Sequence, residues 1–304
     1  MKSELKKKRK ISVFDIILHS FFILMCLCYI LPLMLVVSAS FTSEEVLTSA
    51  SGFSLFPREF TLEAYISAWG NGDAMIRAYG VTAAQAFIGT FLSCIVAGMI
   101  AYAISRSNFR FRGIITGIVF FTMLFSAGMI PTYIVYSKYY GLNDNFLVYI
   151  LPGIAGGAWN TMVYRTFFKG LPESLFESAR LDGARELTIF YKIVVPLSTP
   201  VFASIGFMTL VSKWNNYATS MIYIRDDKLY TLQYLLQRLM KEAEFLNQLA
   251  NNPDISLDPS MIGELPAESL KYAMCVIAAG PMLFAFPFFQ KYFSRGLTIG
   301  AIKG

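Results

Sequence analysis

Residue types that bind metals or attack substrates are sparse in this chain of 304 residues. It has a single histidine, His19, and four cysteines, Cys26, Cys28, Cys94 and Cys275, which all lie in apolar stretches where a thiol behaves as a small hydrophobic group. No histidine and cysteine group has the spacing of a zinc site. The sequence contains neither a G-x-x-x-x-G-K-[ST] phosphate loop nor a G-x-S-x-G nucleophile turn. We therefore predict no metal, no cofactor and no catalytic residue in this chain.

Polar and aromatic residues within apolar stretches form a second group with chemical capacity. Aromatic faces stack on sugar rings and amides bind hydroxyls, so the group fits a substrate pathway for a sugar. The same residues could instead join helices, with Lys213 paired to an acidic neighbouring subunit or extended to the membrane surface. If Lys213 contacts the solute, it favours an acidic sugar such as a uronate. The group comprises Lys213, Trp214, Asn215, Asn216, Tyr217, Asn160, Trp159 and Tyr164.

Apolar runs of membrane length must position these residues. The chain is 55% hydrophobic and 15% charged, whereas soluble proteins carry about 25% charged residues. Six runs are long enough to cross a hydrocarbon layer of about 30 Å as helices. We therefore predict an all-α membrane protein with six transmembrane helices, in a domain over about 77–290. The predicted spans are 16–39, 81–104, 113–136, 146–164, 197–224 and 272–289.

The first run has a second interpretation. A basic segment from Lys6 to Lys10 precedes it and the small residues Ser38 and Ala39 end it, as in a cleavable signal peptide. Its 24 residues exceed the roughly 7 to 15 of a signal-peptide core, which favours a retained helix.

Basic residues indicate the orientation. With the N-terminus inside, the cytoplasmic segments hold 17 Lys and Arg and the outer segments hold 8, as the positive-inside rule expects. Acidic residues are more numerous in the outer segments than in the cytoplasmic ones. The net charge of +6 is therefore divided between two opposed faces and does not indicate nucleic-acid binding. The cytoplasmic segments are 1–15, 105–112, 165–196 and 290–304, and the outer segments are 40–80, 137–145 and 225–271.

The two long outer segments carry helical patterns. Thr61 is a suitable N-cap for a short amphipathic helix, and leucines from Leu232 to Leu239 repeat with helical spacing in the second segment. Turn-forming residues in 247–268 predict a polar loop before the last span.

The most informative cytoplasmic segment is the loop over 171–196. Phe176 and Ala179 fall on the apolar face of a short helix whose opposite face carries Glu177. Gly183 then breaks the helix, and a second amphipathic segment follows. A helix, a bend and a second helix are suited to binding a groove on a soluble partner, and a plain surface connector is the alternative.

This loop resembles the EAA loop of permease subunits of ATP-binding-cassette importers, whose pattern is roughly E-A-A-x-x-D-G-A followed by I-x-x-P-x-x-x-P. Ser178 departs from the usual alanine. The resemblance implies the type I importer permease fold, in which cytoplasmic coupling helices dock an ATPase subunit. In this chain the motif consists of Glu177, Ser178, Ala179, Arg180, Leu181, Asp182, Gly183 and Ala184, followed by Ile193, Pro196 and Pro200. The docking residues that the resemblance implies are Phe176, Glu177, Ala179, Asp182, Gly183 and Ala184.

Other segments are similar to maltose-type carbohydrate permeases of the oligosaccharide and polysaccharide branch, although many such permeases have proline where Thr231 stands. The similar segments are Phe60-Thr61-Leu62, Trp214-Asn215, Leu229-Tyr230-Thr231-Leu232-Gln233 and the tail 290–304. This resemblance implies a multi-pass protein of the cell membrane with both termini cytoplasmic. It implies a heterodimer with a second permease subunit, two ATPase subunits that hold ATP and Mg, and an extracellular solute-binding protein. Together they would import a carbohydrate by alternating access.

Other classes remain open at this point: a secondary transporter, an ATP-binding-cassette permease for a non-sugar solute, a membrane-bound enzyme and a scaffold. A secondary transporter usually carries buried carboxylates, and no Asp or Glu falls within the six predicted spans. An enzyme would need catalytic residues that the motifs do not supply.

Overall fold

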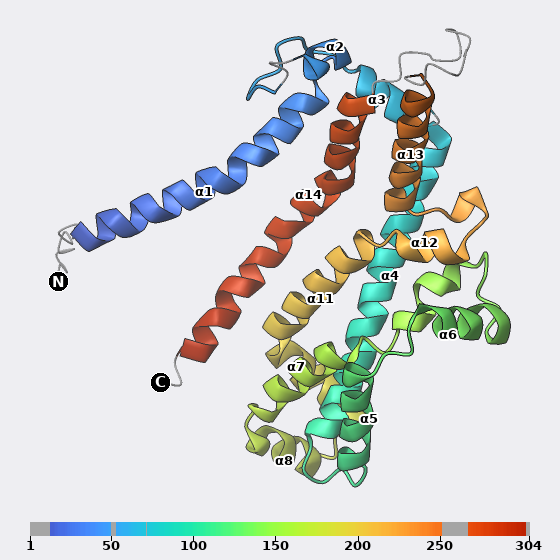
Figure 1. Ribbon diagram of the computed structural model, residues 1–304. Coiled ribbons are helices and arrows are strands. Elements are labelled where there is room, and N and C mark those ends of the chain that lie inside the picture. The colour runs from blue at the N-terminus through green and yellow to red at the C-terminus, as the bar shows by residue number, and fades with distance from the viewer. Residues whose placement is uncertain (1–12, 50–52, 71, 251–266, 302–304) are drawn as a thin grey trace. The chain divides into compact units, whose positions relative to one another are not determined.

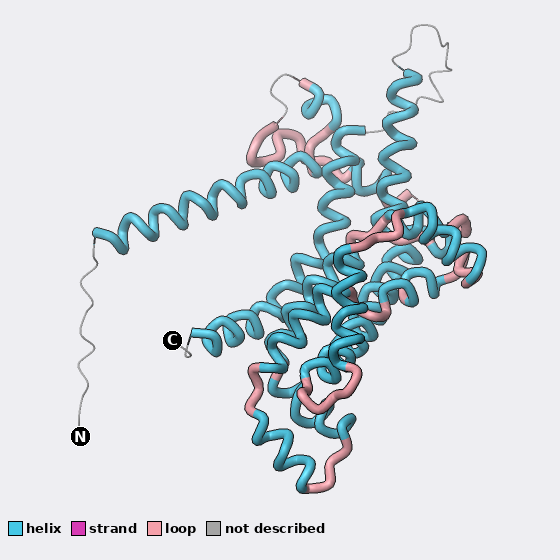
Figure 2. Tube along the Cα trace, turned by 60° about the horizontal axis from the view of Figure 1, so that its bottom comes forward, coloured by secondary structure: helices cyan, strands magenta, loops and turns pink. Residues whose placement is uncertain are grey.

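The computed structural model describes residues 13–49, 53–70, 72–250 and 267–301. Regular structure in these ranges is helical, apart from one isolated bridge between Thr42 and Phe60 (Figure 2). The all-α prediction is therefore confirmed for this part of the chain. Most of the basic N-terminal segment and most of the predicted polar loop over 247–268 lie outside the described residues.

The chain divides into two units, and the first comprises residues 1–70 and 240–277. Its helices are α1 (Val13–Ser40), α2 (Glu44–Thr48), α3 (Glu63–Ala68), the second half of α13 (Leu232–Ala250) and the start of α14 (Ala267–Ala301). α1 is apolar, and most of its side chains before the last turn are exposed, as expected for a helix that faces lipid. The N-cap of α3 is Leu62, one residue beyond the predicted Thr61, although the Thr61 hydroxyl accepts the N–H of Glu63 over 3.1 Å.

A carboxylate from α2 holds the beginning of α14. The two oxygens of Glu44 accept the backbone N–H groups of Glu268 and Ser269, each over 2.9 Å. The first N–H groups of a helix have no partner within the helix, and a negative charge there is favourable. Glu44 therefore fixes the N-terminal end of α14 within the first unit.

The second unit comprises residues 71–239 and 278–304, with the long helix α4 (Gly72–Ser105) along its middle. α4 packs against α7 (Ala158–Lys169) and α11 (Thr199–Trp214) (Figure 1). The first half of α13 and the second half of α14 also belong to this unit. The remaining elements are α5 (Arg112–Leu124), α6 (Met129–Ile134), η1 (Val135–Tyr139), η2 (Phe146–Tyr149), η3 (Leu151–Gly153), α8 (Glu173–Leu181), α9 (Glu186–Ile189), η4 (Phe190–Val194), α10 (Val195–Leu197), α12 (Ala218–Tyr223) and η5 (Asp227–Leu229).

Small residues allow the close packing on α4. A Cβ on Gly98 would lie 2.8 Å from the Phe202 ring, and one on Gly156 would lie 2.5 Å from the Cβ of Ala97. Gly156 also has φ +76°, a conformation that favours glycine. Glycines thus allow close packing where the segment before α7 and the helix α11 meet α4.

Three of the predicted spans are broken helices, which the apolar runs did not reveal. The span 113–136 divides into α5 and the pair α6–η1, bent by 117°. The span 146–164 begins with η2 and η3 and bends by 47° into α7. The predicted span 197–224 divides into α11, which begins at Thr199, and α12; α11 itself is bent by 83° from the segment Glu186–Leu197.

These bends limit what hydropathy and length alone establish. Among the described residues, three helices are long and apolar enough to cross a membrane: Val13–Ser40, Gly72–Ser105 and Glu268–Lys291. The number rises to six when each bent pair is counted as one span. Hydropathy reports whether a segment can lie in lipid, but it does not report whether its backbone runs straight.

Candidate docking loop and substrate pathway

The 171–196 loop contains the two helical segments expected from its pattern. Pro172 immediately precedes α8, and Asp182 follows its last residue. Gly183 has φ +77°, and the N–H of Ala184 bonds to the carbonyl of Ala179 over 2.9 Å, which closes the helix end. The chain then continues through α9 and the π-helical turn η4.

One face of α8 is fixed to the protein's own core. Phe176 is fully buried and Ala179 is 9% exposed, in a cluster that includes Phe168, Ile189 and Phe190. These two residues of the predicted docking set therefore anchor the helix instead of facing outward. Apolar burial of this kind supplies most of the energy that holds a short helix in place.

The opposite face of the loop is open. Glu177, Asp182 and Gly183 are exposed, and Ala184 is partly buried. Leu181 stands among them with 89% of its surface exposed. Sequence reasoning assigned Leu181 no role, although a leucine on the polar side of an amphipathic helix was the available signal.

Arg106, just after α4, joins α8 to the bundle. Its guanidinium donates to the Glu173 carboxylate over 3.0 Å and to the Phe168 carbonyl over 2.8 Å. The guanidinium carbon also lies 3.9 Å from the centre of the Phe176 ring. Arg106 is 6% exposed, and a buried charge requires such a complete set of partners. No motif pointed to this residue.

A second carboxylate links the next helix to the same place. Glu186, at the start of α9, accepts the Tyr102 hydroxyl over 2.5 Å and the Nε–H of Arg180 over 3.1 Å. Partial burial raises the pKa of Glu186, but the hydrogen bonds from Tyr102 and Arg180 outweigh it and leave that pKa below its ordinary value. Glu186 is therefore an anion held between α4 and α8.

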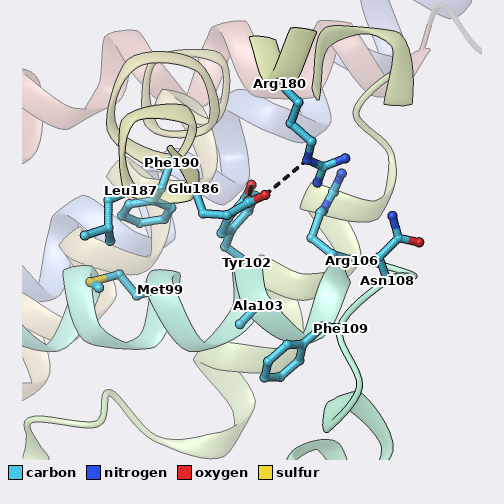
Figure 3. Close-up of a pocket in the computed structure, with 10 residues that line it drawn as sticks. All are labelled: Met99, Tyr102, Ala103, Arg106, Asn108, Phe109, Arg180, Glu186, Leu187 and Phe190. Carbon is cyan, nitrogen blue, oxygen red and sulfur yellow. Dashed lines mark hydrogen bonds and ion pairs between the residues drawn. The ribbon is translucent and has the colours of Figure 1, made fainter. Parts of the chain in front are cut away.

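A cavity of about 410 Å³ lies beside these groups. Figure 3 shows that Arg180, Glu186, Tyr102 and Arg106 gather at one side, while Met99, Leu187 and Phe190 form an apolar side. The remaining lining residues are Ala103, Asn108 and Phe109.

Lys213, predicted in the substrate pathway, packs between helices. Its Nζ donates to the Tyr149 carbonyl over 3.3 Å, and a Cβ added to Gly89 would lie 2.9 Å from that nitrogen. The Lys213 carbonyl also accepts the side chain of Gln85 over 2.7 Å. The lysine thus joins α11 to α4 and to the segment before α7.

Three more members of the predicted pathway are also inside the packing. Trp214 is 3% exposed and donates from its indole nitrogen to the Ala278 carbonyl over 3.0 Å. Tyr164 is fully buried and stacks on Phe168. The Asn160 amide donates to the Gly156 carbonyl over 2.7 Å, so its amide is used within the bundle.

The other four members are exposed, and these are Trp159, Asn215, Asn216 and Tyr217. Asn215 to Tyr217 form the break between α11 and α12. The Asn216 side chain accepts the N–H of Thr219 over 3.1 Å, and that of Asn215 accepts from Gln233 over 3.2 Å. The predicted group of eight therefore separates into a packing set and an exposed set.

Hydroxyl groups hold the segment after α12 to the bundle. The Ser220 hydroxyl lies 2.6 Å from that of Tyr149 and 2.8 Å from that of Thr231. The Thr231 N–H also donates to Ser220 over 3.2 Å, a bond that a proline at this position could not make. This segment is consequently ordered up to the start of α13.

Together, the apolar helices, several of them broken, define a helical membrane protein over the residues that the structure describes. Residues 94–299 match the family described as binding-protein-dependent transport system inner membrane component, and the chain belongs to that family. It is a permease component of such a system.

Individual relatives agree along nearly the whole chain. The chain is 35% identical over 292 residues to the polygalacturonan/rhamnogalacturonan transport system permease protein YtcP of Bacillus subtilis (strain 168), covering 96% of this chain and 99% of YtcP. It is 35% identical over 277 residues to protein LplC of the same organism, covering 90% of each. A crystal structure of a bacterial ABC transporter involved in the import of the acidic polysaccharide alginate matches with a TM-score of 0.74 and 29% identity, covering 94% of this chain and 98% of that chain.

Proposed function

We propose that this chain is one of two permease subunits of an ATP-driven importer that moves an oligosaccharide from an acidic, uronate-containing polysaccharide across the cell membrane. The observation that carries this proposal is the similarity over 96% of the chain to a permease of polygalacturonan/rhamnogalacturonan transport. The alginate importer supports the same chemical class.

The 171–196 loop is the proposed docking site for an ATPase subunit. Glu177 and Asp182 offer negative charge to a basic groove, and exposed Leu181 offers an apolar contact between them. Phe176 and Ala179 act from behind by fixing the helix, and Gly183 and Ala184 shape the bend. Two ATPase subunits with ATP and Mg would supply the energy, since this chain has no phosphate loop.

The remaining partners follow from the family. A second permease subunit would complete the membrane pathway, and an extracellular solute-binding protein would deliver the sugar. The excess of Lys and Arg in the predicted cytoplasmic segments supports cytoplasmic termini. ATP binding would then draw the loops together and change which side of the membrane the pathway faces.

Within the pathway, the exposed set of Trp159, Asn215, Asn216 and Tyr217 is proposed to meet the sugar. An indole or phenol face can stack on a sugar ring while amides bind its hydroxyls. The packing set of Lys213, Trp214, Asn160 and Tyr164 would shape the pathway without contacting the solute. The preference for an acidic sugar would consequently not depend on Lys213.

The test is uptake into proteoliposomes that contain both permease subunits and the ATPase subunits, with the cognate binding protein outside. We expect ATP-dependent uptake of short oligogalacturonates and at least a tenfold lower rate for neutral oligosaccharides of equal length, about 1.4 kcal/mol of discrimination. Equal uptake of both would refute the acidic assignment. Uptake without ATPase subunits would refute the ATP-driven mechanism.

A further inference from the structure

We infer that Arg106 is a positioning residue that makes the 171–196 loop and the adjacent end of α4 move as one body. It does so through a polar ring formed by Tyr102, Arg106, Glu173, Arg180 and Glu186. This inference rests on the proposed docking of an ATPase subunit on the loop. It concerns the step after docking, in which movement of the loop must reach the membrane helices.

The ring is closed by four contacts between side chains and one short link along α4. Arg106 meets one oxygen of Glu173 over 3.0 Å, and the other oxygen lies 3.8 Å from Arg180. Arg180 meets Glu186 over 3.1 Å, and Glu186 accepts the Tyr102 hydroxyl over 2.5 Å. The Ser105 hydroxyl completes the ring because it accepts from Arg106 over 3.1 Å and donates to the Tyr102 carbonyl over 2.7 Å.

The ring passes through three helical segments. Tyr102 lies in the last turn of α4, and Arg106 directly follows the last residue of that helix. Glu173 and Arg180 come from the two ends of α8, and Glu186 begins α9. A movement of either loop helix relative to α4 therefore breaks at least one charged contact.

Arg106 is the member that the others cannot replace. Its guanidinium simultaneously donates to Glu173, the Phe168 carbonyl and Ser105, and lies against the Phe176 ring. A planar guanidinium can make these contacts together, whereas the point charge of lysine cannot. Its exposed fraction is 6%, so its partners belong to this chain and it is not part of the open docking face.

Because α8 is short, its orientation needs to be fixed by Arg106. The helix has nine residues, which is too few for an isolated helix to be stable. Its orientation consequently depends on what holds it, which is Phe176 in the core and Arg106 above that ring. Loss of Arg106 would leave the exposed docking residues present but free to tilt without moving α4.

The experiment compares ATP hydrolysis with uptake in the complete importer in proteoliposomes. The variants are Arg106→Gln, Arg106→Lys and Glu173→Gln, and the matched control is Arg110→Gln, an exposed arginine four residues beyond Arg106. We expect ATPase subunits to co-purify with all four variants in wild-type amounts. We expect the ATP hydrolysed per sugar imported to rise on the order of tenfold in Arg106→Gln, within the range of coupling between distant sites.

The milder variants separate positioning from folding. Arg106→Lys keeps the charge and should give an intermediate ratio, Glu173→Gln should raise the ratio, and the control should match wild type. Because the ratio is taken per imported sugar, it does not change if a variant merely lowers the amount of folded complex. If the ATP hydrolysed per sugar imported were unchanged in both Arg106→Gln and Glu173→Gln, this inference would be overturned while the proposed docking would stand. Failure of the wild-type chain to retain any ATPase subunit would overturn the proposed docking as well.

Discussion

The backbone N–H of Leu232 donates to the hydroxyl of Thr82 over 2.7 Å, and both residues are fully buried. This bond joins the first residue of α13 to α4, which lies 150 positions earlier in the chain. Thr82 thereby satisfies an N–H group that would otherwise have no partner at a helix start.

Thr82→Val should therefore destabilise the protein. Valine keeps the shape but leaves the Leu232 N–H buried without an acceptor, at a cost of about 1–3 kcal/mol. The measurement is the thermal unfolding midpoint in detergent. Thr122→Val is the control, since Thr122 is exposed and its hydroxyl bonds only within its own helix, and its midpoint should stay near wild type. Equal midpoints for both variants would contradict the role of Thr82.

Gly183→Ala and Gly183→Pro test the bend after α8. Alanine at φ +77° costs roughly 1–2 kcal/mol, and proline cannot adopt this φ at all. We expect reduced binding of the ATPase subunit with alanine and abolished uptake with proline, while both variants still insert in the membrane. Gly113→Ala is the matched control because its added Cβ would meet open space. Normal uptake by Gly183→Pro would contradict the docking assignment.

Glu177→Lys tests the charge of the open face. Glu177 is exposed, so the change should leave the unfolding midpoint unaltered, yet it should abolish uptake by opposing a basic groove on the ATPase subunit. Co-purification of ATPase subunits and uptake are measured together. The same exchange at exposed Glu63, in the first unit, should leave both unchanged. Wild-type uptake by Glu177→Lys would remove this residue from the docking face.

Gly89→Ala tests the packing of Lys213. The added Cβ would lie 2.9 Å from the Lys213 Cε and Nζ, so the ammonium must leave the Tyr149 carbonyl, at a cost of about 1–3 kcal/mol. In a Lys213→Ala background the same change should cost almost nothing, because the space is then free. Gly80→Ala, on the same helix with open space, is the control. Equal destabilisation by Gly89→Ala in both backgrounds would show that the lysine does not occupy this place.

Asp144 predicts a dependence of stability on pH. Its carboxylate accepts the backbone N–H groups of Arg225 and, over 3.0 Å, of Asp226, and these bonds lower the pKa of Asp144 below its ordinary value. The stabilisation is therefore complete above the unfolded-state pKa of about 3.9 and is lost as the pH falls through the lower folded-state pKa. Asp144→Asn should remove this acidic change in the unfolding midpoint while tolerating the positive φ of 51°. Identical dependence of the unfolding midpoint on pH in wild type and Asp144→Asn would contradict this role of Asp144.

Much of the fold was predictable because a helix that crosses lipid must be a long run of apolar residues. Apolar runs located the helical regions, and Gly183 and Leu232 sit where the helical patterns placed a bend and a helix start. The breaks near Gly128 and Asn215 were missed, since an apolar run looks the same whether its helix is continuous or interrupted.

The candidate site was predictable only in part, for a different reason. The pattern identified α8 and its apolar face, but it could not tell that Phe176 is enclosed by this chain while Leu181 stays open. Arg106 lies 67 positions before Glu173, and no local pattern joins residues so far apart. A charge in an apolar run is costly and needs a polar partner, but the sequence did not show that the Tyr149 carbonyl accepts a hydrogen bond from Lys213.

The breaks within the spans carry a consequence for hydration. Between α5 and α6, and again between α11 and α12, backbone N–H and C=O groups leave the helical ladder. Hydrocarbon offers such groups no hydrogen bonds, so irregular backbone within a bilayer must face water or other protein. Each break therefore marks a place where the backbone of this chain must meet water or other protein and not lipid.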